Sequence, residues 1–321
     1  MSAANDGDPP SSPMLSWLPA KPTCSWSGIR CNAAGRVTEI SLPGAGLNGT
    51  LGTFNFTTFP ALTKLDLCSN NITGTIPANV VTNLTYLDLS QNSLSGEIPD
   101  ALPATMRGIK YLNLSWNGLD GPIPRSLSGM REMRSFDVSG NKLTRAIPPG
   151  LFMNWPEITL FHARDNPLSG SIPPEISNAT KLQSLYLCLN SLSGQIPVEI
   201  GRLTNLQYLI LARNFLSGSI PHSVGNMSRL LEGEVPTAIS LQSLQFLDLG
   251  NNRLSGMIPY LGMRKLLGIS LDLLYMDLSS NAFSGIVQTS TNSNLSLQFV
   301  DLANNNLMGG FPLHYTTAPN R

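Results

Sequence analysis

Leucines recur in a fixed arrangement along most of the chain. From Leu62 to Pro77 the sequence is LTKLDLCSNNITGTIP, which follows the pattern L-x-x-L-x-L-x-x-N-x-L-x-G-x-I-P. The pattern begins again at Leu84, Ile109, Met133, Ile158, Leu182, Leu206, Leu244, Leu273 and Leu297, with a weaker first copy at Val37. Most asparagines of the pattern lie 22 to 25 residues apart. Self-similarity at such a period is the signature of a repeat architecture.

Each repeat contains the signals for one strand and one turn. In L-x-x-L-x-L the leucines alternate with outward residues, which predicts short strands at Lys64–Cys68, Tyr86–Ser90, Tyr111–Ser115 and onward. One unit cannot bury its own apolar face, so successive units must stack into a solenoid. The asparagine is expected to turn inward and satisfy backbone groups that the turn leaves unpaired. The Gly and Pro of L-x-G-x-I-P are expected to end the strand and lead the chain around the convex side.

This pattern resembles the plant-specific leucine-rich repeat family over about residues 15–312, and the G-x-I-P ending marks that subclass. The resemblance implies an α/β fold, a right-handed solenoid with a concave parallel β-sheet and convex 3₁₀ or short helical turns. The implied division is a disordered stretch at 1–14, a cap at 15–36, a solenoid of about 11 repeats plus two truncated ones at 37–312, and a tail at 313–321.

The segment WLPAKPTCSWSGIRC at residues 17–31 resembles the N-terminal cap of the same family. The resemblance implies a Cys24–Cys31 disulfide, and an oxidised pair indicates a location outside the cytosol. Cys68 and Cys188 occupy the same repeat position five coils apart, about 24 Å at the usual strand spacing, so both are predicted to be free thiols.

Two places interrupt the repeat. SRLLEGEVP at Ser228–Pro236 passes from an opening leucine directly to a closing L-x-G-x-V-P, and the segment Lys265–Asn281 starts one repeat inside another. A missing strand is expected to leave a gap in the sheet or to force neighbouring segments to slide. Residues 37–225 and 240–312 would then unfold separately, with fast amide exchange between Met227 and Ala238. The interrupted repeats and the absence of a closing cysteine pair indicate a fragment or a shortened gene product.

Composition and charge exclude several classes of binding partner. Only 12% of residues are charged, and 20 basic residues balance 20 acidic ones, so neither nucleic acid nor an anionic membrane is an expected partner. No stretch approaches the roughly 18 apolar residues of a membrane helix, and the first six residues lack the features of a secretory signal. Among eight N-x-S/T sequons, Asn83, Asn178 and Asn226 are the favoured glycosylation acceptors, whereas a glycan at Asn113 would obstruct the concave face.

Catalytic and cofactor motifs are weak. Gly44–Gly49 matches G-x-G-x-x-G, but its glycines fall in repeat register and no helix is expected to open there. The three histidines, His162, His222 and His314, lack metal-ligand spacing. The chain is therefore predicted to have no metal, no cofactor and no enzymatic activity, so that any kinase domain would belong to a longer parent.

The repeats can be compared with one another to find a binding face. The outward residue between the two strand leucines is usually Asp, but three consecutive repeats carry His162, Tyr186 and Ile210 instead. The outward neighbours of these three positions are Leu160, Ser184, Tyr208, Arg164, Cys188, Ala212, Asp165, Leu189 and Arg213. Aromatic, apolar and arginine side chains are typical of interface hot spots. The predicted ligand-binding residues are His162, Arg164, Asp165, Tyr186, Cys188, Leu189, Tyr208, Ile210 and Arg213, with Trp116 as a separate anchor. Drift on an unselected face would produce the same pattern.

The resemblance implies a protein- or peptide-binding domain, the extracellular ligand-sensing part of a plant receptor-like kinase or receptor-like protein. Its implied partners are a peptide or protein ligand and a co-receptor, with the parent protein at the outer face of the plasma membrane. The alternative is a secreted inhibitor of pectin-degrading enzymes that resembles the polygalacturonase-inhibiting proteins. Some plant ice-binding proteins carry similar repeats, but regular Thr or Asn arrays are not evident.

Overall fold

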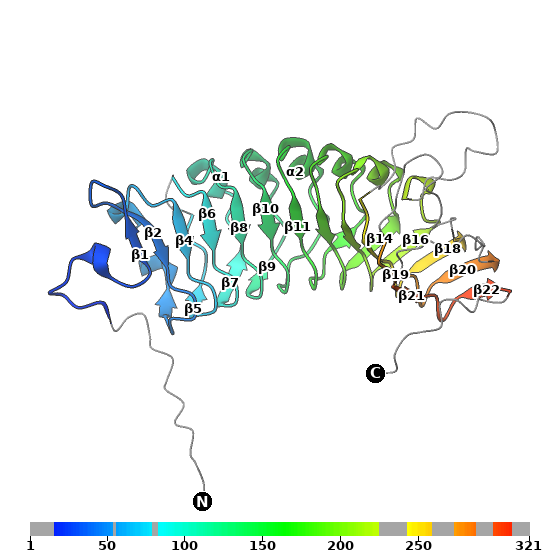
Figure 1. Cartoon of the computed structure of the whole chain (residues 1–321), viewed down its shortest axis with the longest axis horizontal. Coiled ribbons are helices and arrows are strands. Elements are labelled where there is room, and N and C mark those ends of the chain that lie inside the picture. Colours follow the sequence, from blue (N-terminus) through cyan, green and yellow to red (C-terminus); the bar gives the residue numbers. More distant parts are fainter. Residues whose placement is uncertain are drawn as a thin grey trace, which may run out of the picture.

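The protein forms one elongated stack of coils in a computed structural model, which describes residues 16–53, 56–78, 83–224, 243–258, 273–286 and 298–309. The coils follow one another from the N-terminal to the C-terminal end, with their strands side by side (Figure 1). The predicted solenoid is confirmed. The terminal stretches predicted at 1–14 and 313–321 lie outside the described residues.

The largest sheet has 12 strands, one from the cap and one from each of eleven coils, and covers the concave face. In spatial order its strands are β1 (Ile29–Cys31), β2 (Val37–Ser41), β4 (Lys64–Asp66), β6 (Tyr86–Asp88), β8 (Tyr111–Asn113), β10 (Ser135–Asp137), β11 (Leu160–His162), β13 (Ser184–Tyr186), β15 (Tyr208–Ile210), β17 (Phe246–Asp248), β19 (Tyr275–Asp277) and β21 (Phe299–Asp301). β1 is antiparallel to β2, and every later pairing is parallel. The predicted strands begin where expected and end two residues earlier.

The L-x-G segments form further strands. From the sequence these segments were expected only to end the concave strand of each repeat. One sheet contains β3 (Asn48–Thr50), β5 (Asn71–Gly74), β7 (Ser93–Glu97) and β9 (Gly118–Asp120). Another contains β12 (Ser169–Gly170), β14 (Ser191–Gln195), β16 (Phe215–Gly218), β18 (Arg253–Met257), β20 (Ala282–Ile286) and β22 (Asn306–Met308). The glycine is needed here for its backbone conformation, since Gly194 has φ +78° and Gly218 has φ +76°.

Short helices form the convex side, as predicted. They are η3 (Leu51–Thr53), η4 (Phe56–Thr58), α1 (Leu102–Thr105), η5 (Arg125–Gly129), α2 (Pro149–Asn154), η6 (Pro174–Asn178), η7 (Val198–Arg202) and η8 (His222–Val224), and η2 (Thr23–Ser25) lies in the cap. In η5, η6 and η7 the proline of the repeat is the N-cap residue, and the helix begins directly after it. Among the described residues, no helix has the length and apolar character needed to span a bilayer.

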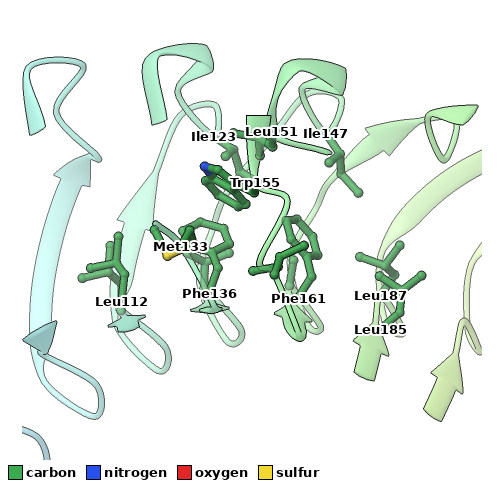
Figure 2. Packing of buried hydrophobic residues seen from close by; sticks show 14 of the residues in the cluster. Leu112, Ile123, Met133, Phe136, Ile147, Leu151, Trp155, Phe161, Leu185 and Leu187 are labelled. Atoms are coloured by element: carbon green, nitrogen blue, oxygen red, sulfur yellow. The ribbon is translucent and has the colours of Figure 1, made fainter. Parts of the chain in front are cut away.

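The core lies between the concave sheet and these helices and consists mostly of the repeat leucines and isoleucines. The middle coils replace leucine with aromatic residues. Phe136, Phe161 and Trp155 are completely buried and in mutual contact, with ring centroids 5.2 to 6.5 Å apart (Figure 2). The indole Nε1 of Trp155 donates a hydrogen bond to the Leu127 carbonyl at 3.0 Å. The aromatic cluster therefore joins three successive coils.

The repeat asparagines form a ladder inside the stack, as predicted. Asn190 is representative. Its side-chain nitrogen donates to the carbonyls of Ala163, Leu187 and Cys188 at 3.0 to 3.1 Å, and its oxygen accepts the Leu168 amide at 3.2 Å. Each asparagine thus joins its own coil to the preceding one, which satisfies backbone groups that the turn would otherwise leave unpaired.

The N-terminal cap covers the first coil. The disulfide between Cys24 and Cys31 is present, and Trp17 stacks on Trp26 with ring centroids 4.9 Å apart. Cys68 and Cys188 are free, as predicted.

Of the two alternatives expected at the first interruption, the gap in the concave sheet is wrong, and a neighbouring segment fills the place. β15 pairs directly with β17 in the standard register, and β17 pairs with β19 in the same way. Across the first interruption, Asn252 still accepts the Leu216 amide at 3.1 Å and donates to the Leu211 carbonyl at 3.1 Å. Because the repeats share one geometry, the next complete strand takes the place of the missing one. The pairing of β15 with β17 removes one reason for separate unfolding of 37–225 and 240–312, which stays a prediction, and Met227–Ala238 lies outside the described residues.

Candidate binding face

The concave sheet presents its outward side chains in rows, because parallel strands pair in identical register. The first outward position of each strand forms one row and the third position forms the next. His162, Tyr186 and Ile210 are direct register partners in the third-position row of β11, β13 and β15. The sequence comparison therefore placed these three side chains together correctly.

Aromatic contacts join the residues of the predicted face. The rings of His162 and Tyr186 stack with centroids 4.2 Å apart, and Tyr186 meets the edge of Tyr208 at 6.3 Å. Burial raises the pKa of the Tyr186 hydroxyl, so this side chain is a neutral hydrogen-bonding group over the physiological range. The sequence predicted exposed side chains at Ile210, Leu160 and Leu189. In the structure each of them is half-buried, because neighbouring rows cover part of it.

Trp116 is part of the same surface, although the sequence interpretation treated it as separate. The guanidinium carbon of Arg164 lies over the Trp116 ring, 5.9 Å from its centroid. The two residues come from coils two apart, and Gly140 lies between them. A Cβ at Gly140 would lie 2.6 Å from Trp116 Cε3, so only glycine leaves room for the ring. We call Trp116, His162, Arg164, Tyr186, Tyr208 and Ile210 the central patch.

Arg164 retains unused hydrogen-bonding capacity. Its Nε is buried and has no hydrogen-bond partner among the described residues. A buried donor without a partner costs free energy. Arg164 also contributes a permanent positive charge to the central patch.

The remaining predicted ligand-binding residues lie at the margin of the central patch. Asp165, Leu189 and Arg213 occupy the left-handed position before the ladder asparagine, with φ between +55° and +57°. Asp165 and Arg213 are exposed. Cys188 is half-buried, and burial raises the pKa of its thiol, which makes it a poor nucleophile.

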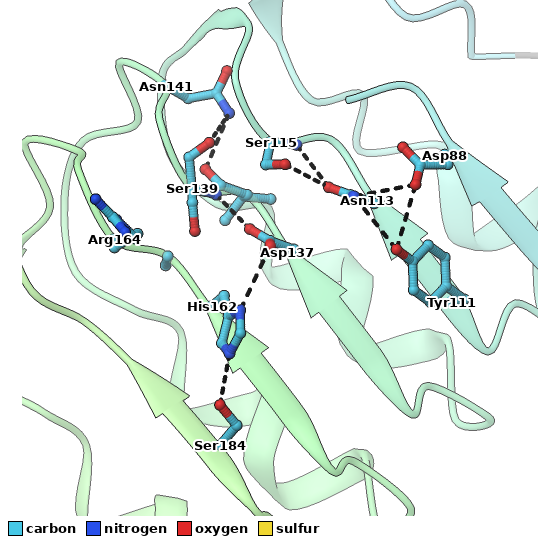
Figure 3. Close-up of polar contacts among 12 residues, drawn as sticks. Asp88, Tyr111, Asn113, Ser115, Asp137, Ser139, Asn141, His162, Arg164 and Ser184 are labelled. Atoms are coloured by element: carbon cyan, nitrogen blue, oxygen red, sulfur yellow. Dashed lines mark hydrogen bonds and ion pairs between the residues drawn. The ribbon is translucent and has the colours of Figure 1, made fainter. Parts of the chain in front are cut away.

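Asp137, His162 and Ser184 form a hydrogen-bonded chain across three strands (Figure 3). His162 Nδ1 is 3.5 Å from Asp137 Oδ2, and His162 Nε2 is 2.7 Å from Ser184 Oγ. The order matches that of serine hydrolases, which also need backbone amides directed at the developing oxyanion. The Ser184 amide instead donates to the Thr159 carbonyl at 3.1 Å. We therefore infer that the contacts of Asp137 and Ser184 orient His162, and we assign no catalytic role to these three residues.

A second polar cluster lies near the N-terminal end. Ligand atoms of Asp66, Cys68 and Asp88 lie within 4.8 Å of one another. Burial, followed by the hydrogen bond to Asp66, raises the pKa of the Cys68 thiol to about 11, so the thiol is protonated and a weak metal ligand. Asp88 accepts hydrogen bonds from Tyr111 and Asn113 (Figure 3) and from the Ser90 hydroxyl. Its oxygens are already occupied, and we assign no metal here.

Two of the favoured glycosylation acceptors can be placed. Asn83 and Asn178 are exposed, and Asn178 ends the convex helix η6, whereas Asn226 lies outside the described residues. Asn113 lies on the concave strand β8 and donates to Asp88, as expected for a position unsuited to a glycan.

The sequence interpretation missed a row of aromatic residues. The first outward position is aromatic in four consecutive strands, and we call these residues the aromatic row: Tyr208, Phe246, Tyr275 and Phe299. Their ring centroids are 4.9, 6.0 and 4.5 Å apart in turn, with interplanar angles of 13°, 26° and 6°. The same comparison between repeats would have found them, had it been applied to this position as well.

The charge of Asp248, beside this row, is expected to reduce stability near neutral pH. Burial and then the neighbouring Asp277 raise the pKa of Asp248 to about 6, and Arg213 opposes the shift. Because this pKa exceeds the unfolded value, the folded state binds more protons between the two, and stability increases as pH falls from about 7 to 4. Asp248→Asn, which preserves an acceptor for the Gly250 amide, should raise the melting temperature at pH 7.5 and change it less at pH 5.0. Equal shifts at both pH values would contradict this explanation.

The comparisons with known proteins agree with the fold. Family models described as leucine rich repeat match residues 60–119, 82–143, 181–203, 205–227 and 243–262. The matched parts of the chain thus consist of leucine-rich repeats, and the relatives that it matches include plant receptor-like kinases. One of them, the LRR receptor-like serine/threonine-protein kinase RGI3 of Arabidopsis thaliana, is 42% identical over 57 residues, which are 18% of this chain and 5% of the relative.

Solved structures extend the similarity over nearly the whole chain. The PEPR1–AtPEP1 complex is 32% identical with a TM-score of 0.75, over 94% of this chain and 44% of the other. The Arabidopsis receptor kinase HAESA, in complex with the peptide hormone IDA and the co-receptor SERK1, is 28% identical with a TM-score of 0.67, over 95% of this chain and 56% of the other. A plant ice-binding protein is 24% identical with a TM-score of 0.69, over 92% and 91%, which shows the shared fold alone. The chain spans about half the length of these receptor structures.

Proposed function

We propose that this chain is the ligand-recognising part of a plant receptor-like kinase or receptor-like protein, and that the central patch binds a peptide or protein ligand. The similarity to peptide-bound receptor structures over more than nine-tenths of the chain is the observation that carries the proposal. In this proposal the parent protein lies in the plasma membrane with this domain outside the cell, and a co-receptor completes the complex. The chain itself performs no catalysis.

The mechanism is recognition by a surface that is ordered before binding. The strands of the central patch are fixed by sheet pairing and by the asparagine ladder, so little conformational entropy is lost on association. His162, Tyr186 and Tyr208 offer aromatic area, and Arg164, over the ring of Trp116, offers a positive charge. Rigid aromatic groups around an arginine are the composition expected of a hot spot.

Two substitutions test the patch. Peptides should be selected from a random library on the immobilised chain, and affinities measured by titration. Tyr186→Ala and Arg164→Ala should each weaken binding of the selected peptide by about 1–2 kcal/mol, or about five- to thirtyfold, as truncation of a hot-spot residue does. Glu199→Ala, in the convex helix η7, is the control and should leave the affinity unchanged. Equal losses of affinity from the concave and the convex substitutions would contradict ligand binding by the central patch.

A further inference from the structure

We propose that the C-terminal part of the concave face binds a basic, proline-rich segment in the polyproline II conformation, which lies across β15, β17, β19 and β21. The proposal rests on the proposed function, because it names the chemistry of a partner on the same concave face. Its elements are the aromatic row and a parallel row of carboxylates, Asp248, Asp277 and Asp301, which we call the carboxylate row.

The carboxylate row is directly beside the aromatic row. Each aspartate lies two residues after an aromatic residue on the same strand, and the aspartates are register partners of one another. All three side chains are half-buried. An extended ligand that crosses these strands would therefore meet rings along one edge and carboxylates along the other.

The carboxylate row is not neutralised within the described residues. One oxygen of each aspartate accepts the backbone amide two residues further on, from Gly250, Ser279 and Ala303, at 2.8 to 3.1 Å. No ion pair to any of the three aspartates is found in the described part of the chain, in contrast with Asp137, which His162 faces. Burial and, after it, the charge of Asp277 raise the pKa of Asp248, so these two neighbouring carboxylates repel each other. A cationic partner would relieve this repulsion.

The aromatic row determines the kind of cationic partner. Its rings lie nearly parallel within the pairs Tyr208–Phe246 and Tyr275–Phe299, so the ring faces inside each pair are covered. Free ring faces, which cation–π binding requires, are therefore scarce. Ring edges instead offer a ridged apolar surface, on which prolines and the aliphatic stems of Arg or Lys can pack while the charged ends reach the carboxylates.

Spacing favours polyproline II over a β-strand. A polyproline II helix rises about 3.1 Å per residue, so every third residue recurs after about 9.3 Å. Alternate strands of a sheet are about 9.6 Å apart, which is the expected separation of Asp248 and Asp301. Basic residues at positions i and i+3 would match these two carboxylates. In a β-strand ligand, side chains on one face recur after about 6.6 Å and match neither one nor two strand spacings.

The site also continues from the central patch. Tyr208 belongs to both surfaces, since it contacts Tyr186 on one side and stacks on Phe246 on the other. An unbroken series of ring contacts extends from His162 to Phe299 at the C-terminal end of the stack, where β19 and β21 are labelled in Figure 1. One ligand can therefore engage the central patch and the carboxylate row together.

The test uses two labelled synthetic peptides of equal composition, Arg-Pro-Pro-Arg-Pro-Pro-Arg and Arg-Arg-Arg-Pro-Pro-Pro-Pro, and fluorescence anisotropy with the full chain. The first should bind more tightly, and its affinity should decrease with added salt. Asp301→Asn should weaken binding of the first peptide by about three- to tenfold, and the Asp248→Asn, Asp277→Asn, Asp301→Asn triple variant should abolish it. Asparagine preserves the acceptor for each backbone amide, so these variants should fold. Asp120→Asn, at an exposed position of β9, is the control.

Equal affinity for the two peptides, or no effect of the triple variant, would overturn this inference. Such a result is distinguishable from failure of the proposed function. If library peptides still bind through Tyr186 and Arg164, the proposed function stands and only the basic, proline-rich partner is wrong. The inference is likewise wrong if every selected library peptide is acidic or neutral and the triple variant does not change the affinity for any of them.

Discussion

Trp155→Ala should destabilise the solenoid by about 3–5 kcal/mol, the cost observed when a large buried aromatic residue is truncated. The side chain is completely buried and packs against Phe136 in its own coil and Phe161 in the next. A cavity at this point weakens the interfaces on which a repeat protein depends. Denaturant unfolding followed by circular dichroism measures the change.

Two further variants separate packing from hydrogen bonding. Trp155→Phe keeps most of the ring but removes the donor to the Leu127 carbonyl, so a smaller loss is expected. Met153→Ala removes a large side chain that is 62% exposed in the preceding helix, and it should have little effect. A loss from Met153→Ala as large as that from Trp155→Ala would show that the aromatic cluster is not the cause.

Asn190→Leu should cost about 2–4 kcal/mol, although leucine is more apolar and close in size. The substitution leaves the Leu168 amide without its acceptor and removes one of the donors to each of three carbonyls. An unsatisfied buried group costs about 1–3 kcal/mol, and the lost carbonyl hydrogen bonds add to this. The same denaturant titration provides the measurement. Asn205→Leu is the matched control, because Asn205 is exposed and makes one hydrogen bond, to the Thr180 carbonyl. Equal losses at the two sites would argue against the ladder.

The period of the leucines and the recurring asparagine were sufficient to predict the concave sheet and the ladder. Both depend on contacts within a coil or between adjacent coils of the same pattern, so one repeat represents all. The L-x-G strands were missed because glycine and proline indicate a turn when a segment is considered alone. Those strands exist because adjacent coils supply partners, as when the Ser191 amide donates to the Leu168 carbonyl.

Features that depend on particular side chains were harder to predict. The contact between Trp116 and Arg164 spans two coils and requires the absence of a side chain at Gly140, which no repeat pattern indicates. The interrupted repeats were interpreted from missing residues, whereas the structure depends on the strands that remain, and those pair as β15 with β17. The aromatic row was missed because only one outward position was compared between repeats.

Hydroxyl-radical footprinting with and without a peptide selected on the chain tests the central claim most directly. The peptide should reduce oxidation of Trp116, Tyr186 and Tyr208 on the concave face and leave the exposed Met153 on the convex helix α2 unchanged. Protection of Met153 with unchanged oxidation of Trp116 and Tyr186 would contradict ligand recognition by the central patch.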